Sequence, residues 1–408
     1  MTIETTMPAR SERPAPTVSV DRIFQLDMLR GWAVLGILAV NAMAFAWPMA
    51  AATSTGDVFG HTGADAWGDW VVEVFFHDKF RSLFTMLFGV SIFLVGGERE
   101  NEARGKLLRS RLFWLAVFGT IHGAAIWYGD ILLHYAYCGL IVLLMRSWSA
   151  RRLLWVGGGV SVFWMLVATI APLAMGAMGP QMAAKMAAAG PQITPEQLSA
   201  AVAAYKVSAL APWIENLKSE LLLQSLSLTL LPVTVPLMLL GLGLYKSGFF
   251  SGRAPTAIYA VFAILGACIV GVDGWASQPV IDAGSVSIPG LDSAAGGMAP
   301  LVTLAYASML MLMTRFGLRI VTGRLAPVGQ MAFTNYLSQS LIMASLFYMP
   351  WGPQWIGTMG PAGLWPIVVG VWALQLVWSP LWLSVFSMGP LEWVWRCLTY
   401  GRIVPFRK

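Results

Sequence analysis

Charged side chains are scarce in this sequence. Asp, Glu, Lys and Arg make up 11% of its 408 residues, against roughly a quarter in an ordinary soluble domain. Hydrophobic residues make up 57%, which leaves too little charge to cover a water-facing surface. The composition therefore argues against a water-soluble protein. It predicts an integral membrane protein that is embedded in the lipid bilayer.

Cysteine is also rare, and the common metal and nucleotide motifs are missing. Cys138, Cys268 and Cys397 are widely separated in apolar stretches, without the paired spacing of zinc sites or disulfide frameworks. No Walker loop, dinucleotide fingerprint or zincin helix occurs. The sequence therefore predicts no metal site, no permanently bound cofactor and no ATP-driven step in this chain.

Apolar runs recur along the whole chain. A membrane-spanning helix needs about 20 mostly apolar residues, so this length has room for roughly ten. The runs fall near residues 31–49, 80–95, 112–128, 131–145, 153–175, 221–244, 257–272, 299–313, 327–348 and 364–386. They predict an all-α, polytopic membrane helical bundle of about ten transmembrane helices.

The basic residues give an independent test of this number. Cytoplasmic loops of membrane proteins collect Lys and Arg, and external loops lack them. Most of the 26 basic residues fall in segments that ten spans place inside, and one missed span would invert half of the pattern. Both ends of the chain are therefore predicted to be cytoplasmic. This placement also explains the net charge of +6 without a nucleic-acid partner.

The two ends differ from the body in composition. Residues 1–20 are rich in Pro, Ser, Thr, Arg and Glu and lack the apolar core of a signal peptide, so they predict a disordered cytoplasmic tail. Residues 21–401 are predicted to form a single transmembrane helical domain. Residues 402–408 are predicted to be a second cytoplasmic tail.

One external segment, at about residues 176–218, is too polar to span. Within it Thr194, Pro195 and Gln197 form the pattern of a capping box, which predicts the start of a short helix. This helix is expected to lie on or near the membrane surface as a lid or spacer, with a substrate gate as the alternative.

Two histidines flank a predicted external turn. His122 precedes the turn by seven residues and His134 follows it by five, so they are expected at similar depth on adjacent helices and are candidates to face one another. Asp130 lies four residues before His134, a spacing that lets a carboxylate orient an imidazole. The arrangement predicts a general base or proton relay. The alternative is a hydrogen bond between helices.

Other polar residues within or beside the apolar runs are candidates because such groups are costly in a bilayer. Asn335 and Gln339 share a helix face and suit interhelical hydrogen bonds, with a polar ligand as the alternative. A polar stripe with a spacing of four residues consists of Asp65, Asp69, Glu73, His77 and Arg81. Together with the adjoining Lys79, this stripe is expected to be either a solvated helix face or the wall of an external polar cavity. Near the inner surface, candidates to hold the phosphates of a nucleotide-like donor are Arg30, Arg324 and Arg396. The neighbouring inner-surface acids are Asp27 and Glu392.

Several blocks together resemble the YeiB-type family of bacterial membrane proteins, the domain of unknown function 418. They are LDMLRGWAVLGILAVNAM, DKFRSLFTMLFGVS, FGTIHGAAIWYGDILLHYAYCGL, APVGQMAFTNYLSQSLI and GPLEWVWRCLTYG, and they occur in order over nearly the whole chain. The resemblance implies a multi-pass protein of the bacterial plasma (inner) membrane. It assigns no activity by itself.

The blocks are also similar to a wider group of membrane acyltransferases that includes heparan-alpha-glucosaminide N-acetyltransferase. The shared features are the Asp-x-x-Arg-Gly start, here Asp27, Arg30 and Gly31, and an asparagine at the end of the first span, here Asn41. In that group an acyl-CoA donor enters from the cytoplasm, and a histidine after the first span assists transfer. The matching histidine here would be His61, although its spacing departs from the pattern, and His122 is the competing candidate.

The leading functional hypothesis is therefore a membrane O- or N-acyltransferase. It would use acyl-CoA as co-substrate and modify a cell-envelope sugar, a lipid headgroup or a small molecule. The main rival is a proton-coupled transporter or flippase, in which the same polar residues line a permeation route. The third hypothesis is a non-enzymatic sensor or assembly partner. The sequence leaves the oligomeric state open.

Overall fold

The computed structural model describes residues 23–52, 63–179, 192–278 and 288–408, together with Gln181, Lys185 and Gly190. The predicted tail at residues 1–20 and the candidate His61 lie outside the described residues. Within them every regular element is helical, and the isolated β-bridge that joins Phe386 to Arg407 is the only extended pairing. The predicted all-α class is confirmed.

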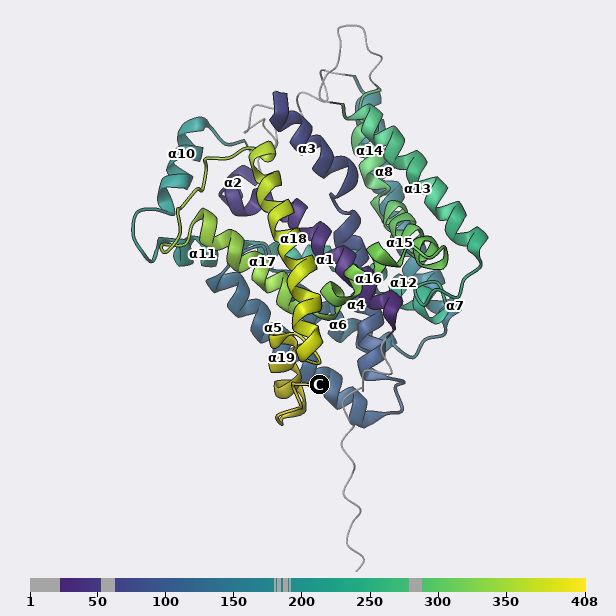
Figure 1. Ribbon diagram of the computed structural model, residues 1–408. Coiled ribbons are helices and arrows are strands. Elements are labelled where there is room, and N and C mark those ends of the chain that lie inside the picture. Colours follow the sequence, from purple (N-terminus) through teal and green to yellow (C-terminus); the bar gives the residue numbers. More distant parts are fainter. Residues whose placement is uncertain are drawn as a thin grey trace, which may run out of the picture.

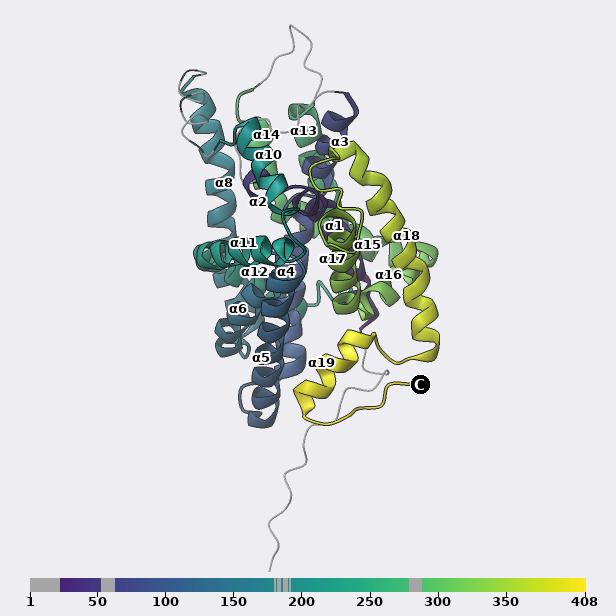
Figure 2. The ribbon, with the colours of Figure 1, turned by 90° about the vertical axis from the view of Figure 1, so that its left-hand side faces the viewer.

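The helices follow one another along the whole chain, as Figures 1 and 2 show. Their bounds are α1 Phe24–Ala46, α2 Met49–Ala52, α3 Gly63–Phe75, α4 Lys79–Gly96, α5 Glu102–Ala125, α6 Leu132–Met145, α7 Ala150–Leu153, the π-helix η2 Leu154–Gly158, α8 Gly159–Ala177, α10 Pro195–Ala204, α11 Ala211–Ser227, the 3₁₀ turn η3 Leu228–Leu230, α12 Leu231–Lys246, α13 Thr256–Ala276, α14 Leu291–Gly297, α15 Ala299–Arg315, α16 Arg319–Gln330, α17 Ala332–Phe347, α18 Pro361–Val385 and α19 Pro390–Tyr400. Helix α3 lies at one end of the bundle, whereas α19 and the C-terminus lie toward the other.

Six of these helical stretches are long and apolar enough to cross a membrane. They are Phe24–Ala46, Gly63–Gly96, Ala150–Ala177, Ala211–Lys246, Thr256–Ala276 and Pro361–Val385. A seventh is obtained if α14 and α15, which meet at an angle of 56°, count as one broken span. The structure thus supports a multi-pass membrane protein, while the number of about ten spans stays a prediction.

The predicted ninth span is not one continuous helix. It is divided into α16 and α17, which meet at Met331. Pro327 lies within the last turn of α16, and proline both lacks an amide donor and crowds the preceding turn of a helix. The helix nevertheless continues through Pro327 to Gln330, and it ends where Met331 leaves the helical conformation, with φ of −111° and ψ of 27°.

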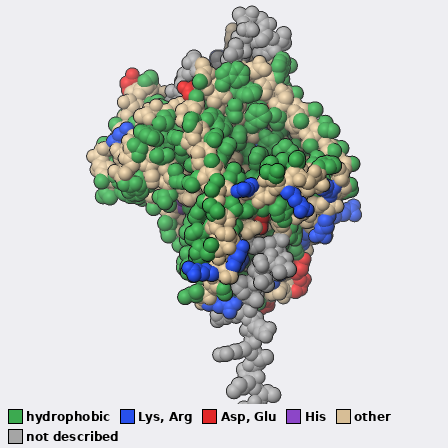
Figure 3. Space-filling view, viewed as in Figure 1, with side chains coloured by type: hydrophobic (Ala, Val, Ile, Leu, Met, Phe, Trp, Pro, Cys, Tyr) green, Lys and Arg blue, Asp and Glu red, His purple; other side chains and the backbone are tan. Residues whose placement is uncertain are grey.

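Large apolar side chains point outward from several helices. Trp155, Ile264 and Leu381, on η2, α13 and α18, are 72%, 66% and 65% exposed, and Figure 3 shows a broad apolar surface over the middle of the molecule. Meanwhile polar side chains such as His122 and Asn335 are buried. This distribution is typical of a bundle whose outer surface contacts lipid.

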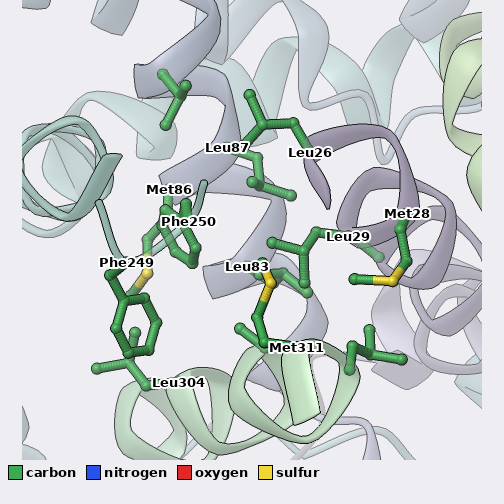
Figure 4. Packing of buried hydrophobic residues seen from close by; sticks show 14 of the residues in the cluster. Leu26, Met28, Leu29, Leu83, Met86, Leu87, Phe249, Phe250, Leu304 and Met311 are labelled. Carbon is green, nitrogen blue, oxygen red and sulfur yellow. The ribbon is translucent and has the colours of Figure 1, made fainter. Parts of the chain in front are cut away.

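One buried apolar cluster joins α1, α4, α12, α13, α15 and α16. Leu29, Met86, Phe250 and Met311 are among its members, as the close view in Figure 4 shows.

Glycines bring some of these helices unusually close together. A Cβ added at Gly89 of α4 would lie 2.0 Å from the carbonyl oxygen of Met238, and one at Gly241 of α12 would lie 2.2 Å from that of Met86. Such contacts between small residues are a common way for helices to pack in membranes.

The capping box predicted in the polar segment is present. Thr194 Oγ1 accepts a hydrogen bond from the Gln197 amide at 3.2 Å, and Gln197 Oε1 accepts one from the Thr194 amide at 3.0 Å. Helix α10 begins at the next residue, as the pattern predicted.

Candidate functional site

A cavity of about 560 Å³ lies among α1, α4, α5, α6, α19 and the break between α16 and α17. The charged side chains in its wall are Asp27, Arg30, Arg104, Arg111, Glu392 and Arg396. Much of the remaining wall is aromatic or aliphatic, including Phe84, Phe88, Leu112, Leu115, Tyr135, Phe333 and Tyr336. The cavity therefore combines four cations with an extensive apolar surface. It brings together Asp27, Arg30, Glu392 and Arg396, but Arg324 is exposed and is not part of the wall.

Arg30 is held in place from two helices. Its Nη1 lies 3.1 Å from Asp27 Oδ1 on α1, and its Nη2 donates to Ser91 Oγ of α4 at 2.9 Å. The next residue, Gly31, lets α16 approach, because a Cβ there would lie 2.0 Å from the Leu325 carbonyl oxygen. The Asp-x-x-Arg-Gly start thus supplies an oriented guanidinium at Arg30. It also supplies, at Gly31, the close contact between α1 and α16. Asn41 lies farther along α1 and is not in the cavity wall.

Two further arginines reach the cavity from α5. The guanidinium of Arg111 lies 3.7 Å from the ring centroid of Trp395, whose Nε1 donates to the Arg111 carbonyl at 3.0 Å. Arg104 donates from Nε to the Val95 carbonyl at 3.0 Å. Sequence reasoning missed both residues because the positive-inside pattern already explained them. The available signal was their spacing of seven, two helical turns on one face.

Glu392 joins α19 to the break between α16 and α17. Its Oε1 accepts hydrogen bonds from the amides of Phe333 at 2.7 Å and Thr334 at 3.0 Å, and its Oε2 accepts one from Thr334 Oγ1 at 2.5 Å. Removal from water raises the pKa of this carboxyl, while the hydrogen bonds from Thr334 act in the opposite direction. The carboxylate satisfies amides that would otherwise lack partners at the start of α17.

His122 and Asp130 form a buried pair outside the cavity wall. His122 Nδ1 lies 2.8 Å from Asp130 Oδ1, and the two side chains are 1% and 0% exposed. Asp130 Oδ2 also accepts a hydrogen bond from the Leu133 amide in the first turn of α6, at 2.8 Å. The expected pairing of Asp130 with His134 is wrong, since α6 begins at Leu132 and helical spacing does not apply to Asp130.

His134 instead connects helices. Its Nε2 lies 2.8 Å from Thr234 Oγ1 of α12, and its Nδ1 lies 3.2 Å from the Tyr137 hydroxyl. The Tyr137 hydroxyl donates to Gln224 Oε1 of α11 at 3.0 Å. These contacts match the interhelical alternative for His134 and do not bring it against His122.

One aromatic ring connects His122 with the cavity. The rings of His122 and Tyr336 lie 5.4 Å apart between centroids, and Tyr336 lines the cavity. His122 Nε2 is buried and has no hydrogen-bond partner among the described residues. The imidazole therefore has an unpartnered nitrogen and lies against an aromatic residue of the cavity wall.

The chain is similar over its length to bacterial proteins without an assigned function. Residues 244–402 match the family described as "Protein of unknown function (DUF418)". The chain is 30% identical to the uncharacterized protein YxaH of Bacillus subtilis over 414 residues, which cover 96% of this chain and 98% of that protein. The chain belongs to the DUF418 family. Its identity to the uncharacterized protein YeiB of Escherichia coli is also 30%, over 93% of this DUF418 chain and 97% of YeiB. No solved structure matches it significantly.

Lys79 and Arg81 lie at a second polar location in this DUF418 protein, outside the cavity. Lys79 is 1% exposed; its Nζ donates to the Glu73 carbonyl at 2.6 Å and lies 3.3 Å from Asp273 Oδ2 of α13. Arg81 Nε donates to Asp78 Oδ1 at 2.8 Å. Asp273 was missed by sequence reasoning, although an acid at the end of an apolar run was a usable signal.

The predicted stripe does not form one wall. His77 pairs with Glu73 at 2.9 Å between Nδ1 and Oε2, whereas Asp65 Oδ1 accepts from the Ala362 amide of α18 at 2.9 Å. Asp78 adopts a left-handed conformation, with φ of 56°, between α3 and α4. The stripe is therefore divided where the two helices meet.

The amide residues of α17 form a buried network between helices. Asn335 Nδ2 donates to Val328 O and Ser379 Oγ, both at 3.0 Å, and Gln339 Nε2 donates to Gln375 Oε1 at 2.9 Å. The structure thus gives these residues the interhelical contacts expected of them. Across the described ranges, no group of three His, Cys, Asp or Glu residues is arranged to hold a metal ion.

Proposed function

We propose that this DUF418 protein is a membrane acyltransferase that moves an acyl group from a cytoplasmic acyl-CoA-type donor to a hydroxyl or amine of an acceptor. One observation carries the proposal. A single cavity joins four arginines to an apolar region, and the buried His122–Asp130 pair lies next to that region. The acceptor class comprises cell-envelope sugars, lipid headgroups and small molecules.

The charges of the cavity suit the donor. Guanidinium groups form strong, directional hydrogen bonds with phosphates, and Arg30 is already oriented by Asp27 and Ser91. The apolar wall suits an acyl chain, because clefts that bind small molecules are mostly apolar with a few placed polar groups. The donor would therefore enter with its phosphates among the arginines and its acyl group toward Tyr336.

The chemistry would depend on His122. An Nδ1–H that donates to Asp130 leaves Nε2 as the basic atom. Nε2 would take the proton of the acceptor while the acceptor oxygen or nitrogen forms a bond to the thioester carbonyl carbon. The carbon–sulfur bond breaks, and the departing thiolate receives the same proton from His122. One proton moves from acceptor to thiol, so the balance is complete.

The proposal includes a topology of about ten spans with both ends inside, in the bacterial plasma membrane. Most of the Lys and Arg side chains visible in Figure 3 lie in the lower part of that face, toward α19 and the C-terminus. This distribution supports a cytoplasmic position for the arginine-lined cavity. The bacterial origin of the two relatives supports the inner membrane.

Binding of acyl-CoAs to purified, detergent-solubilised protein tests the proposal. We expect saturable binding that Arg30→Gln and Arg396→Gln each weaken. Arg324→Gln is the matched control, because Arg324 is exposed and outside the cavity. His122→Gln should keep donor binding and lose donor turnover. If no acyl-CoA of any chain length binds, the acyltransferase proposal fails.

A transporter or flippase is the second candidate, and the α16–α17 break favours it. Gly329, Gln330 and Ala332 at this break line the cavity, and substrate sites of many secondary transporters are formed at discontinuous helices. Proton-driven uptake or flipping of a substrate in vesicles, without any acyl transfer, would place this function first.

A further inference from the structure

Two carboxylates are seated on one face of α5 beside His122. A Cβ added at Gly119 would lie 2.7 Å from Asp130 Oδ2, and one at Gly123 would lie 2.4 Å from Glu220 Cδ. Gly119 and Gly123 are four residues apart, so they share a face of the helix. Asp130 and Glu220 therefore occupy neighbouring positions against α5. A larger residue at Gly119 or Gly123 would clash with them.

Glu220 reaches this face from α11. Asn216, one turn earlier on α11, donates from Nδ2 to the Ile126 carbonyl at 3.0 Å and so fixes α11 against the end of α5. Glu220 Oε1 accepts from Gln224 Nε2 at 2.9 Å. Its Oε2 is buried and has no hydrogen-bond partner among the described residues. The whole residue is only 5% exposed.

Two buried polar atoms on or beside this part of α5 thus have no hydrogen-bond partner within the described ranges. They are Glu220 Oε2 and His122 Nε2, and the latter is an acceptor in the neutral imidazole whose Nδ1–H donates to Asp130. Buried polar atoms nearly always have a hydrogen-bond partner, and each exception calls for an explanation. A group that supplies several N–H or O–H donors would satisfy both atoms.

The charge at this place is negative. In the described part of the chain, no Lys or Arg forms an ion pair with Asp130 or Glu220, whose partners are His122 and Gln224. Arg81 is itself paired with Asp78. A buried carboxylate without a cation is costly, so a positively charged ligand fits better than a neutral or anionic one.

From this arrangement we infer that Glu220 and His122 Nε2 bind the ammonium group of a primary amine. Glu220 supplies the charge and one acceptor, and His122 supplies a second acceptor. The inference rests on the proposed function in one respect: if acyl transfer occurs, it identifies the acceptor as an amine and the product as an amide. The bound ammonium first releases one proton to solvent, and the neutral amine then gives a second proton through His122 to the departing thiolate, as proposed above. Glu220 is then a binding residue for the acceptor.

Matched pairs of small molecules test the inference on the full chain in detergent. Glucosamine against glucose, and ethanolamine against ethylene glycol, differ mainly in an ammonium that replaces a hydroxyl. Calorimetric titration should give saturable binding of the two amines and much weaker binding of the alcohols. Glu220→Gln keeps the size of the side chain and should weaken amine binding by at least roughly tenfold. Glu215→Gln is the control, since Glu215 lies on the same helix and pairs with Lys218 at 2.7 Å.

The outcomes separate this inference from the proposed function. Equal binding of amine and alcohol, amine binding that survives Glu220→Gln, or no binding of either amine each overturn the amine site. The wild-type comparison decides the question even if Glu220→Gln fails to fold. Acyl-CoA binding is measured on the same samples and should be unchanged by Glu220→Gln. If amines bind through Glu220 but acyl-CoA does not bind, the amine site stands and the acyltransferase proposal falls.

Discussion

The Glu392 carboxylate on α19 caps the first turn of α17, with its Oε1 2.7 Å from the Phe333 amide nitrogen. The same residue lines the arginine cavity. The Glu392 side chain thus joins α19 to the start of α17, at the break between α16 and α17 that borders the cavity. The geometry links the stability of α19 to the shape of the cavity.

Replacement of Glu392 by alanine should therefore lower the stability of the protein and disturb the shape of the cavity. Loss of the carboxylate leaves the amides of Phe333 and Thr334 without acceptors, at a cost of about 1–3 kcal/mol. We expect a lower Tm in detergent and weaker acyl-CoA binding. Glu392→Gln, which keeps an acceptor oxygen, should lose less. An unchanged Tm for Glu392→Ala would show that α19 is held by other contacts.

The glycines of α16 offer a matched test of the close contact with α1. A Cβ at Gly329 would lie 1.8 Å from the Asp27 carbonyl oxygen, whereas one at Gly323 meets nothing within 4 Å. Gly329→Ala should lower stability by about 1–3 kcal/mol through overpacking and should displace Asp27 and its partner Arg30 from the cavity wall. Gly323→Ala should be neutral or stabilise by about 0.5–1 kcal/mol, because alanine favours the helix. Thermal unfolding and acyl-CoA affinity are the measurements; equal effects would contradict the contact.

The sequence predicted the parts of this structure that depend on local patterns. Apolar runs predicted helices, and the Thr194–Gln197 pattern predicted a capped helix start that is present. Asp27 and Arg30 of the Asp-x-x-Arg-Gly block both line the cavity, while their role in donor binding stays a prediction. Each of these features is encoded within a few residues of one segment.

The sequence could not predict which distant groups meet. Asp130 was matched with His134 through helical spacing, but it precedes α6 and pairs with His122. Glu220 gave no signal because it stands at the edge of a polar segment, where an acid is ordinary. Its position beside Asp130 depends on how α11 packs on α5, which is a tertiary property.

The buried pair of Lys79 and Asp273 yields a third prediction. Lys79→Met leaves a buried carboxylate without its cation, and removal of one partner from a buried pair costs about 3–5 kcal/mol. The double variant Lys79→Met/Asp273→Leu also removes the unpaired carboxylate and should recover much of the lost stability. Lys218→Met, in the more exposed pair with Glu215, should cost about 0–1 kcal/mol. Tm values of the four proteins, including the wild type, decide this, and a double variant no better than the single would contradict the pairing.

The two buried histidines should respond differently to the same substitution. His122 pairs with Asp130 and presents a free Nε2, whereas both nitrogens of His134 have hydroxyl partners on α6 and α12. His122→Gln should lower the rate of acyl transfer by about 10²–10⁴-fold with donor binding unchanged, since His122 is not in the cavity wall. His134→Gln should lower the Tm and leave the rate per folded molecule near the wild-type value. Single-turnover rates, corrected for the folded fraction, separate the two effects. A large rate loss in His134→Gln, or none in His122→Gln, would move the catalytic base away from His122.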